Sequence, residues 1–302
     1  MIKKVAYIFP GQGSQSIGMG ADLARDFQEA KEVFQEVDEA LHQNLSRLMF
    51  NGELGELTQT QNAQPAIMAV SIAVWRVLQT QGCPMPDAVA GHSLGEYSAL
   101  CAAGSLSLSD TAKLLQSRGH AMAKACEQEK GGMLALLGAS AEQAREIAQN
   151  VGCYVANDNA PGQVVLSGLL SSLEQAKELA QKMVIKRAIS LQVAGAFHSP
   201  LMQSAADEMM SVLADVEFVQ PKIPVFFNVT AEEELDPVHY ADLLTRQIVS
   251  PVRWRELVLN MNATDFVECG SGSVLAGLVK RIMPDVDIKS IGTSEQIKDS
   301  RH

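Results

Sequence analysis

Gly91-His92-Ser93-Leu94-Gly95 follows a short apolar segment at 87–90 and precedes 96–103, a run rich in good helix formers. A strand, a sharp glycine turn and a helix in this order predict a nucleophile elbow, because glycine tolerates the strained turn and the close backbone approach. The Ser93 hydroxyl would then be exposed above a helix N-terminus, whose N–H groups suit a developing oxyanion. The alternative is a glycine-flanked serine in an ordinary turn, and the flanking pattern favours the elbow.

The composition limits the kind of protein that carries this motif. The chain has 302 residues, 47% hydrophobic and 20% charged, as in a soluble globular protein of one large or two ordinary domains. The N-terminal apolar run stops at Pro10-Gly11, too early for a secretory signal, and no apolar stretch reaches membrane-spanning length. Five scattered cysteines without a Cys-x-x-Cys pair favour reduced thiols, and the net charge of −11 argues against nucleic acid. We therefore expect a cytoplasmic protein with neither nucleic acid nor a membrane among its partners.

Strand-like and helix-like segments alternate over most of the chain. Further strands are expected at 5–9, 225–228 and 264–268, and helices at 21–41, 64–80, 109–125, 200–214, 239–248, 252–262 and 272–282. Such alternation predicts an α/β fold with a parallel sheet covered by helices on both faces. The polar tail from Thr293 to His302 is expected to be frayed.

The middle of the chain has a different order of elements. Strand patterns at 133–137, 153–156, 163–167 and 186–193 enclose helical patterns at 140–150 and 171–183. The resulting β-α-β-β-α-β order is that of a ferredoxin-like unit. The simplest organisation is a ferredoxin-like subdomain at 130–194, inserted into a catalytic α/β domain formed by 1–129 and 195–302.

A serine nucleophile needs a base, and histidine is the commonest one. His42 and His120 lie in helical patterns and His302 in the tail, so we expect surface positions for them. His92 precedes the serine and is expected to point to the opposite side of the elbow. His198 follows the inserted segment in a loop at the domain junction, where pockets form. It is therefore the best candidate base, the alternative being a loop histidine bonded only to the backbone.

Six motifs occur in register along the chain. They are FPGQGSQ at 9–15, GHSLGEYSA at 91–99, QSRG at 116–119, NDNAPGQ at 157–163, GAFHSP at 195–200 and RQIVSPVRW at 246–254. Together they resemble the malonyl-CoA:acyl carrier protein transacylases of bacterial type II fatty-acid synthesis, from about residue 5 to about residue 290. The resemblance implies an α/β-hydrolase-like core with an inserted ferredoxin-like subdomain, which agrees with the organisation above.

The resemblance implies roles for the reacting groups. Ser93 would carry the acyl group, and His198 would take its proton and return it to the leaving thiol. The family orients this histidine through a main-chain carbonyl, here that of Gln247, in place of a triad acid. The oxyanion hole would consist of the backbone N–H groups of Gln12 and Leu94.

The resemblance also implies residues that read the substrate. The Arg118 guanidinium would hold the free carboxylate that distinguishes malonyl from acetyl, the alternative being a salt bridge on the helix surface. Phe197 would form a wall against an α-branch and favour malonyl over methylmalonyl. Asn157 and Asn159 match positions near the pocket, although an Asx-turn role is equally open. His92 matches a residue near the active site with a secondary role.

The implied reaction is ping-pong transfer of malonyl from malonyl-CoA, through Ser93, to the phosphopantetheine thiol of acyl carrier protein. It needs no metal and no redox cofactor. The turn at 270–273 reads Gly-Ser-Gly-Ser where the family often has Gly-Pro-Gly-Lys, so a basic contact to the carrier is missing there. Carrier proteins are acidic, as is this chain, so docking needs a local basic patch. Its candidates, each equally compatible with a solvated surface, are Lys182, Lys186, Arg187, Lys280 and Arg281.

Several other functions are alternatives to malonyl transfer in fatty-acid synthesis. The nearest are an acyltransferase subunit of malonate decarboxylase and a free-standing acyltransferase that supplies a polyketide line, which the identity of the carrier would separate. A serine esterase would use the same elbow without a thiol acceptor. A non-enzymatic carrier-binding module would tolerate loss of Ser93.

Overall fold

A computed structural model describes residues 3–300 of the chain. Its larger sheet has six strands in the order β10-β9-β1-β2-β7-β8. These strands are β1 (Val5–Phe9), β2 (Ala88–Gly91), β7 (Val225–Phe226), β8 (Glu233–Glu234), β9 (Asp265–Cys269) and β10 (Asp287–Ile291). All neighbours pair in parallel except β8, which folds back on β7. The predicted parallel sheet is therefore confirmed, with one antiparallel edge strand.

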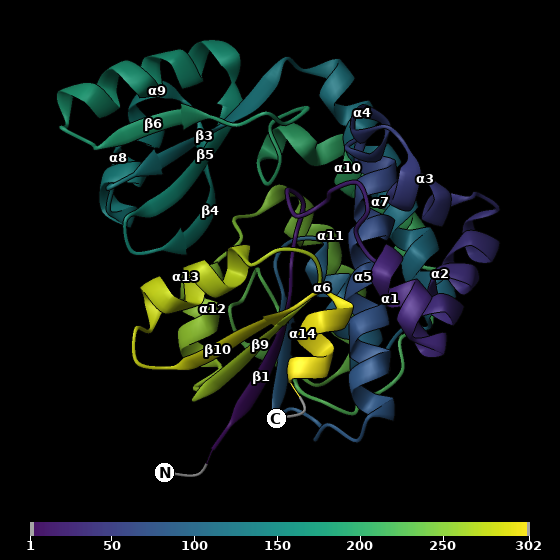
Figure 1. Ribbon diagram of the computed structural model, residues 1–302. Helices are drawn as coiled ribbons and strands as arrows, with labels where there is room; N and C mark the ends of the chain where they lie inside the picture. Colours follow the sequence, from purple (N-terminus) through teal and green to yellow (C-terminus); the bar gives the residue numbers. More distant parts are fainter. Residues whose placement is uncertain (1–2, 301–302) are drawn as a thin grey trace.

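Helices cover both faces of this sheet. They are needed there because residues that point to either face of β1 are buried. Tyr7 and Phe9 belong to an apolar core shared with α2, α5, α7 and α10, whereas Ala6 and Ile8 belong to a core shared with α12 and α13. Figure 1 shows these two groups on opposite sides of the sheet. The helices of this part are α1 (Ala21–Asp26), α2 (Gln28–Leu41), α3 (Leu45–Asn51), α4 (Leu54–Leu57), α5 (Thr60–Thr80), α6 (Gly95–Ala102), α7 (Leu108–Gln128), α10 (Gln203–Leu213), α11 (Tyr240–Val249), α12 (Trp254–Asn260), α13 (Val274–Ile282) and α14 (Ser294–Asp299).

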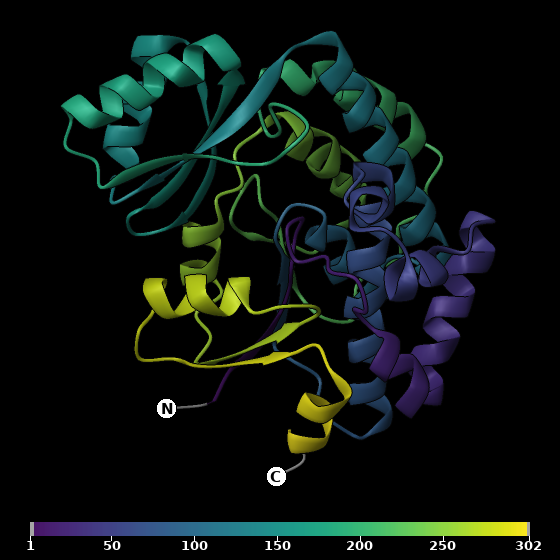
Figure 2. The same ribbon diagram turned by 45° about the horizontal axis from the view of Figure 1, so that its top comes forward.

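A second sheet of four antiparallel strands has the order β4-β5-β3-β6. Its elements are β3 (Gly131–Leu137), α8 (Ala141–Val151), β4 (Tyr154–Ala160), β5 (Gln163–Leu169), α9 (Leu170–Lys182) and β6 (Arg187–Ser190). This is the predicted ferredoxin-like arrangement, and it packs α8 and α9 on one face around a core of its own. Both views show it beside the large sheet and above α12 and α13 (Figures 1 and 2). All six elements fall within 130–194, although the bounds of that subdomain stay a prediction.

The second sheet also packs against the larger unit through one face and one edge. Its face away from α8 and α9 contributes Met133, Ala156 and Val165 to the main apolar core. At its edge, Asn157 forms a parallel bridge to Val252, which leads into α12. The four-stranded unit is therefore packed against the larger one along its open face.

The predicted frayed tail is wrong for the residues that the structure describes. Thr293 caps α14 in a reciprocal capping box with Gln296, and Ile297 is fully buried. Lys298 lies 2.6 Å from the carboxylate of Asp26 in α1, which ties the helix to the N-terminal region. His302 lies outside the described residues.

Other differences concern the ends of elements. The helix expected at 21–41 is interrupted by Phe27, whose φ of −132° is extended and separates α1 from α2. The strand expected at 186–193 ends at Ser190, and β4 continues to Ala160. The helices α3 and α4 and the strand β10 were not predicted, because they are short or lack a clear apolar period. Among residues 3–300, no helix combines the length and apolarity that crossing a bilayer demands.

Candidate active site

The elbow turn depends on two glycines. A Cβ on Gly91 would lie 1.8 Å from the carbonyl carbon of Gly95, and a Cβ on Gly95 would lie 2.2 Å from the backbone oxygen of Phe9. Between them, Ser93 has a φ of 53°, a left-handed conformation that L-residues rarely adopt. The sequence folds into this turn because β2 ends and α6 begins on glycines, which leaves Ser93 raised at the tip.

The predicted serine and histidine lie on two loops that are far apart in the sequence and meet in the folded chain. Ser93 Oγ lies 2.8 Å from His198 Nε2, and His198 Nδ1 donates to the main-chain oxygen of Gln247 at 2.9 Å. Because a carbonyl only accepts, Nδ1 carries the hydrogen and Nε2 is free to accept the serine proton. Burial, and then the charge of Arg118, lower the pKa of His198 to about 3, so its ring is neutral at neutral pH.

Arg118 is buried beneath the nucleophile, on α7. Its Nη1 donates to Gln64 Oε1 at 2.7 Å, and its Nη2 donates to Gln247 Oε1 at 2.8 Å and to Ser93 Oγ at 3.1 Å. Its Nε is buried without a hydrogen-bond partner. The side chain is 1% exposed and forms no ion pair within residues 3–300, so a salt bridge on the helix surface is excluded. A buried guanidinium held only by neutral groups is suited to an incoming anion.

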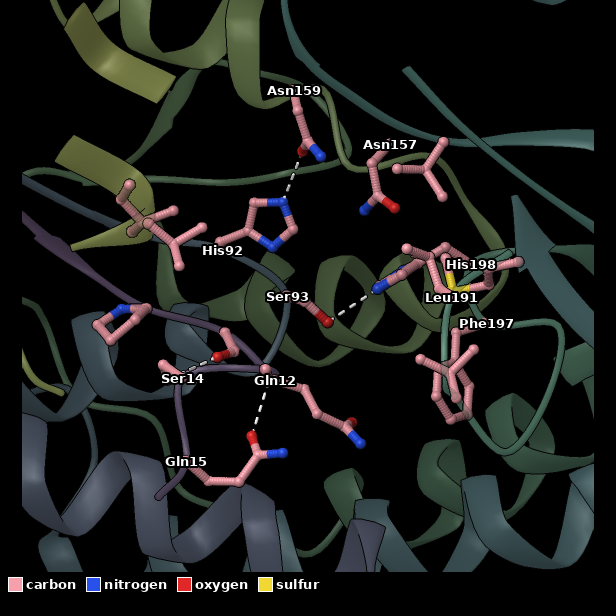
Figure 3. Close-up of a pocket in the computed structure, with 18 of the residues that line it drawn as sticks. Gln12, Ser14, Gln15, His92, Ser93, Asn157, Asn159, Leu191, Phe197 and His198 are labelled. Carbon is pink, nitrogen blue, oxygen red and sulfur yellow. Dashed lines mark hydrogen bonds between the residues drawn. The ribbon is translucent and has the colours of Figure 1, made fainter. Parts of the chain in front are cut away.

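Backbone donors lie at the nucleophile as well. Ser93 N–H is not free, because it donates to Asn228 Oδ1 at 2.8 Å. In the described part of the chain, the N–H groups of Gln12 and Leu94 have no acceptor. Gln12 follows β1 and lines the same cavity as Ser93 (Figure 3). Leu94 is the N-cap residue of α6 and directly follows Ser93. These two N–H groups are therefore available to an oxyanion.

His92 differs from its predicted orientation. Its ring lines the same cavity as Ser93, because its Nε2 bonds to Asn159 Oδ1 at 2.9 Å and the ring packs 5.5 Å from that of Trp254. Figure 3 shows the His92 ring and the Asn159 amide turned toward each other. His92 forms no hydrogen bond to the Ser93 side chain, so the geometry favours His198 as the base.

The two asparagines are on β4 and not in an Asx-turn. Asn157 is 5% exposed and faces the cavity, and the chain turns only after Ala160. Phe197 also lines the cavity, beside His198. The strand position follows from pairing with β5, which carries the polar sequence into the sheet despite its weak strand propensity.

The cavity has a volume of about 270 Å³ and lies between the two sheets. The loop after β1 forms one wall, β3 and β5 contribute Met133 and Val165, and α13 contributes Leu275 and Leu278. Apolar walls around a few convergent polar groups are typical of a small-molecule site. Within residues 3–300, no three His, Cys, Asp or Glu side chains cluster as metal ligands.

Three neighbours of the nucleophile were not predicted. Asn228 donates through Nδ2 to Gly91 O at 2.7 Å, and its own N–H donates to Glu96 Oε2 at 2.6 Å. Glu96 is fully buried, and burial raises its pKa to about 8, opposed by the Asn228 N–H. Gln64 holds Arg118 from α5. Of these three residues, only Asn228 could have been suggested by the sequence. It lies at the end of a predicted strand that could pair with the elbow strand in a parallel sheet.

The candidate docking cations differ in their surroundings. Lys182, Lys186 and Arg187 are exposed on the four-stranded unit. Lys280 donates to the Val286 carbonyl at 2.6 Å, and Arg281 donates to Gln163 Oε1 at 2.7 Å. Lys280 and Arg281 are therefore held by hydrogen bonds within their own chain, and the first three are the better candidates for contacting a carrier.

An α/β fold that presents a serine on an elbow, with a histidine at its hydroxyl and free N–H groups beside it, defines an enzyme of the serine acyltransfer class. The model of the acyl transferase domain family matches residues 6–292. The chain belongs to this acyl transferase family.

The most similar proteins include several with a more specific name. The malonyl CoA-acyl carrier protein transacylase of Bacillus subtilis strain 168 is 42% identical, over 97% of this chain and 94% of its own length. The crystal structure of an acyl-carrier-protein-S-malonyltransferase from Bartonella henselae is 45% identical, with a TM-score of 0.95 and 98% of both chains covered. A malonyl-transacylase solved in complex with a type II polyketide synthase acyl-carrier protein is 36% identical, with a TM-score of 0.94 and 98% coverage of each chain.

Proposed function

We propose that this enzyme transfers the malonyl group of malonyl-CoA to the phosphopantetheine thiol of acyl carrier protein, through a malonyl-Ser93 intermediate. The proposal rests on Arg118, which is buried, forms no ion pair with a carboxylate of residues 3–300, and has its Nη2 3.1 Å from Ser93 Oγ. A malonyl carboxylate is separated from its thioester carbonyl by one methylene, so it would reach the guanidinium while Ser93 reaches the carbonyl. The names of the relatives above support the same substrate and acceptor.

In the first half-reaction, His198 Nε2 takes the Ser93 proton as Oγ attacks the thioester carbon. The tetrahedral oxyanion accepts hydrogen bonds from the N–H groups of Gln12 and Leu94, where one such donor contributes about 3 kcal/mol. The carbon–sulfur bond breaks, and His198 returns the proton to the CoA sulfur.

The second half-reaction repeats these steps with the carrier thiol as the nucleophile. His198 takes the thiol proton, the sulfur attacks the ester carbon, and Ser93 leaves with the proton. The Gln247 carbonyl keeps the Nδ1–H tautomer in both halves. The proposed chemistry draws on no metal or redox cofactor, and we assign it to fatty-acid synthesis in the cytoplasm.

Mass spectrometry after mixing with malonyl-CoA tests this function. A malonyl adduct is expected on the wild type and on Ser204→Ala, which removes an exposed hydroxyl on α10, but not on Ser93→Ala. Absence of the adduct from the wild type would refute the proposal. Rapid hydrolysis of simple esters, with no transfer to a thiol, would indicate an esterase instead.

A further inference from the structure

The Ser93 hydroxyl contacts both a base and a cation. Ser93 Oγ lies 2.8 Å from His198 Nε2 and 3.1 Å from Arg118 Nη2, so the two nitrogens are at most about 6 Å apart. The guanidinium donates to Oγ, and it therefore occupies one of the two lone pairs of the hydroxyl oxygen and lowers the nucleophilicity of that oxygen. Gln64 and Gln247 hold Arg118 in this position with neutral amide oxygens.

The charge of Arg118 also acts on the base. The titratable groups that face His198 are Arg118 on α7 and His92 in the elbow, and both lower its pKa when charged. His92 is kept neutral because burial lowers its pKa. Burial lowers the pKa of Arg118, but a guanidinium starts so far above neutral pH that it stays charged. An imidazolium at His198 would therefore form beside an uncompensated cation.

Among residues 3–300, no carboxylate forms an ion pair with that cation. Tyr97 and Glu96 are the acidic groups that act electrostatically on Arg118, and both side chains are fully buried. Burial raises the pKa of the Tyr97 hydroxyl, so this group is neutral at neutral pH. Since burial raises the pKa of Glu96 to about 8, this carboxyl is mostly protonated at neutral pH. The guanidinium also retains an unused donor, because Arg118 Nε has no partner.

We propose that the carboxylate of the acyl group itself activates the Ser93–His198 pair, by drawing Arg118 Nη2 away from Ser93 Oγ and neutralising the charge that opposes proton transfer to His198. This inference rests on the proposed function, and it adds that Arg118 selects malonyl in the chemical step and not only in binding. Gln64 and Gln247 act as positioning residues, because their hydrogen bonds fix the position of the guanidinium before the acyl group binds.

In the activated step, the carboxylate, Ser93 and His198 act in sequence. The carboxylate accepts from Arg118 in place of Ser93 Oγ, so Oγ is no longer hydrogen-bonded to a cation when it forms the bond to the thioester carbon. The serine proton passes to His198 Nε2, the carbon–sulfur bond breaks, and the proton leaves on the CoA sulfur. During this step the imidazolium stands beside a neutral ion pair in place of a lone cation.

An acyl group without a carboxylate should therefore react slowly even when bound. Two unit charges about 6 Å apart at an effective dielectric constant of about 20 interact strongly enough to change a rate roughly 100-fold. The sign of the pH effect follows from the same contact. Neutralised Arg118 raises the pKa of His198 in the complex, so the rate with malonyl-CoA falls on the acid side at a higher pH than the rate with acetyl-CoA.

Rapid-quench mass spectrometry of Ser93 acylation at saturating malonyl-CoA or acetyl-CoA, measured over a range of pH, tests the inference. We expect a saturated rate about 100-fold lower with acetyl-CoA, and an acid limb displaced to lower pH. Formate, added as a separate carboxylate, should accelerate acetylation of the wild type. In Arg118→Ala, the acetyl acid limb should move to higher pH and the formate effect should vanish. Arg76→Ala removes an arginine paired with Glu36 outside the pocket, and it should behave as wild type.

Equal saturated rates with coincident acid limbs for the two substrates in the wild type would overturn the inference, whatever formate does. Discrimination would then reside in binding alone. This comparison needs no variant, so it holds even if Arg118→Ala does not fold. Failure of malonyl-CoA to acylate Ser93 would instead refute the proposed function.

Discussion

Asn228 is predicted to hold the nucleophile in its strained conformation. Its amide bridges the two sides of the elbow, since Oδ1 accepts from Ser93 N–H at 2.8 Å and Nδ2 donates to Gly91 O at 2.7 Å. A left-handed serine costs on the order of 1–3 kcal/mol unless its surroundings enforce it. Asn228 is fully buried, so water does not replace these bonds.

Asn228→Ala should therefore affect both stability and rate. Two lost bonds, with a buried Gly91 carbonyl left unpaired, should lower the free energy of unfolding by about 2–4 kcal/mol. Relaxation of the turn should also move the Leu94 N–H away from the oxyanion. Since loss of one such donor costs about 100-fold or more, we expect Ser93 acylation to slow by about 100-fold.

Urea unfolding and rapid-quench acylation by malonyl-CoA measure the two effects. The matched control is Asn260→Ala, which removes one side-chain bond to the Ala231 carbonyl outside the pocket. It should cost about 1 kcal/mol and leave acylation unchanged. An Asn228→Ala enzyme that acylates Ser93 at the wild-type rate would refute the claim that this amide positions the nucleophile.

Three further predictions concern the buried acid, the elbow turn and the carrier surface. Because burial raises the pKa of Glu96 to about 8, the wild type should lose stability as pH rises from about 4.5 through 8. Glu96→Gln should remove that loss, which is on the order of a few kcal/mol in urea unfolding, and a difference independent of pH would contradict it. Gly91→Ala should lower the free energy of unfolding by more than about 3 kcal/mol, since its Cβ meets backbone at 1.8 Å, whereas Gly55→Ala, with open space around it, should not. Lys186→Glu with Arg187→Glu should raise the KM for acyl carrier protein roughly 10-fold without changing Ser93 acylation, and an unchanged KM would exclude this surface from docking.

Much of the fold could be predicted from local patterns. The elbow is visible because glycines 91 and 95 stand at a strand end and a helix start, and the ferredoxin-like order follows from six well-separated periodic segments. Short elements carried too little signal. α14 was missed because its stability comes from the Thr293 cap and from contact with Asp26, far away in the sequence.

The site was only partly predictable, for a physical reason. Ser93, His198 and Arg118 belong to motifs whose residue types suggest their chemistry. The supporting groups do not, because Asn228 and Glu96 act through contacts that only the folded chain creates. The orientation of His92 depends likewise on Asn159 from the second sheet, so the sequence predicted the wrong side of the elbow.

In the proposed mechanism, Ser93 stores a malonyl group for delivery to a carrier thiol. The direct test is to isolate the malonyl-enzyme free of malonyl-CoA, add phosphopantetheinylated acyl carrier protein, and follow both proteins by mass spectrometry. We predict that the malonyl mass leaves Ser93 and appears on the carrier in equal amount. A malonyl group that stays on the enzyme, or is released as free malonate while the carrier remains unmodified, would contradict this role of Ser93.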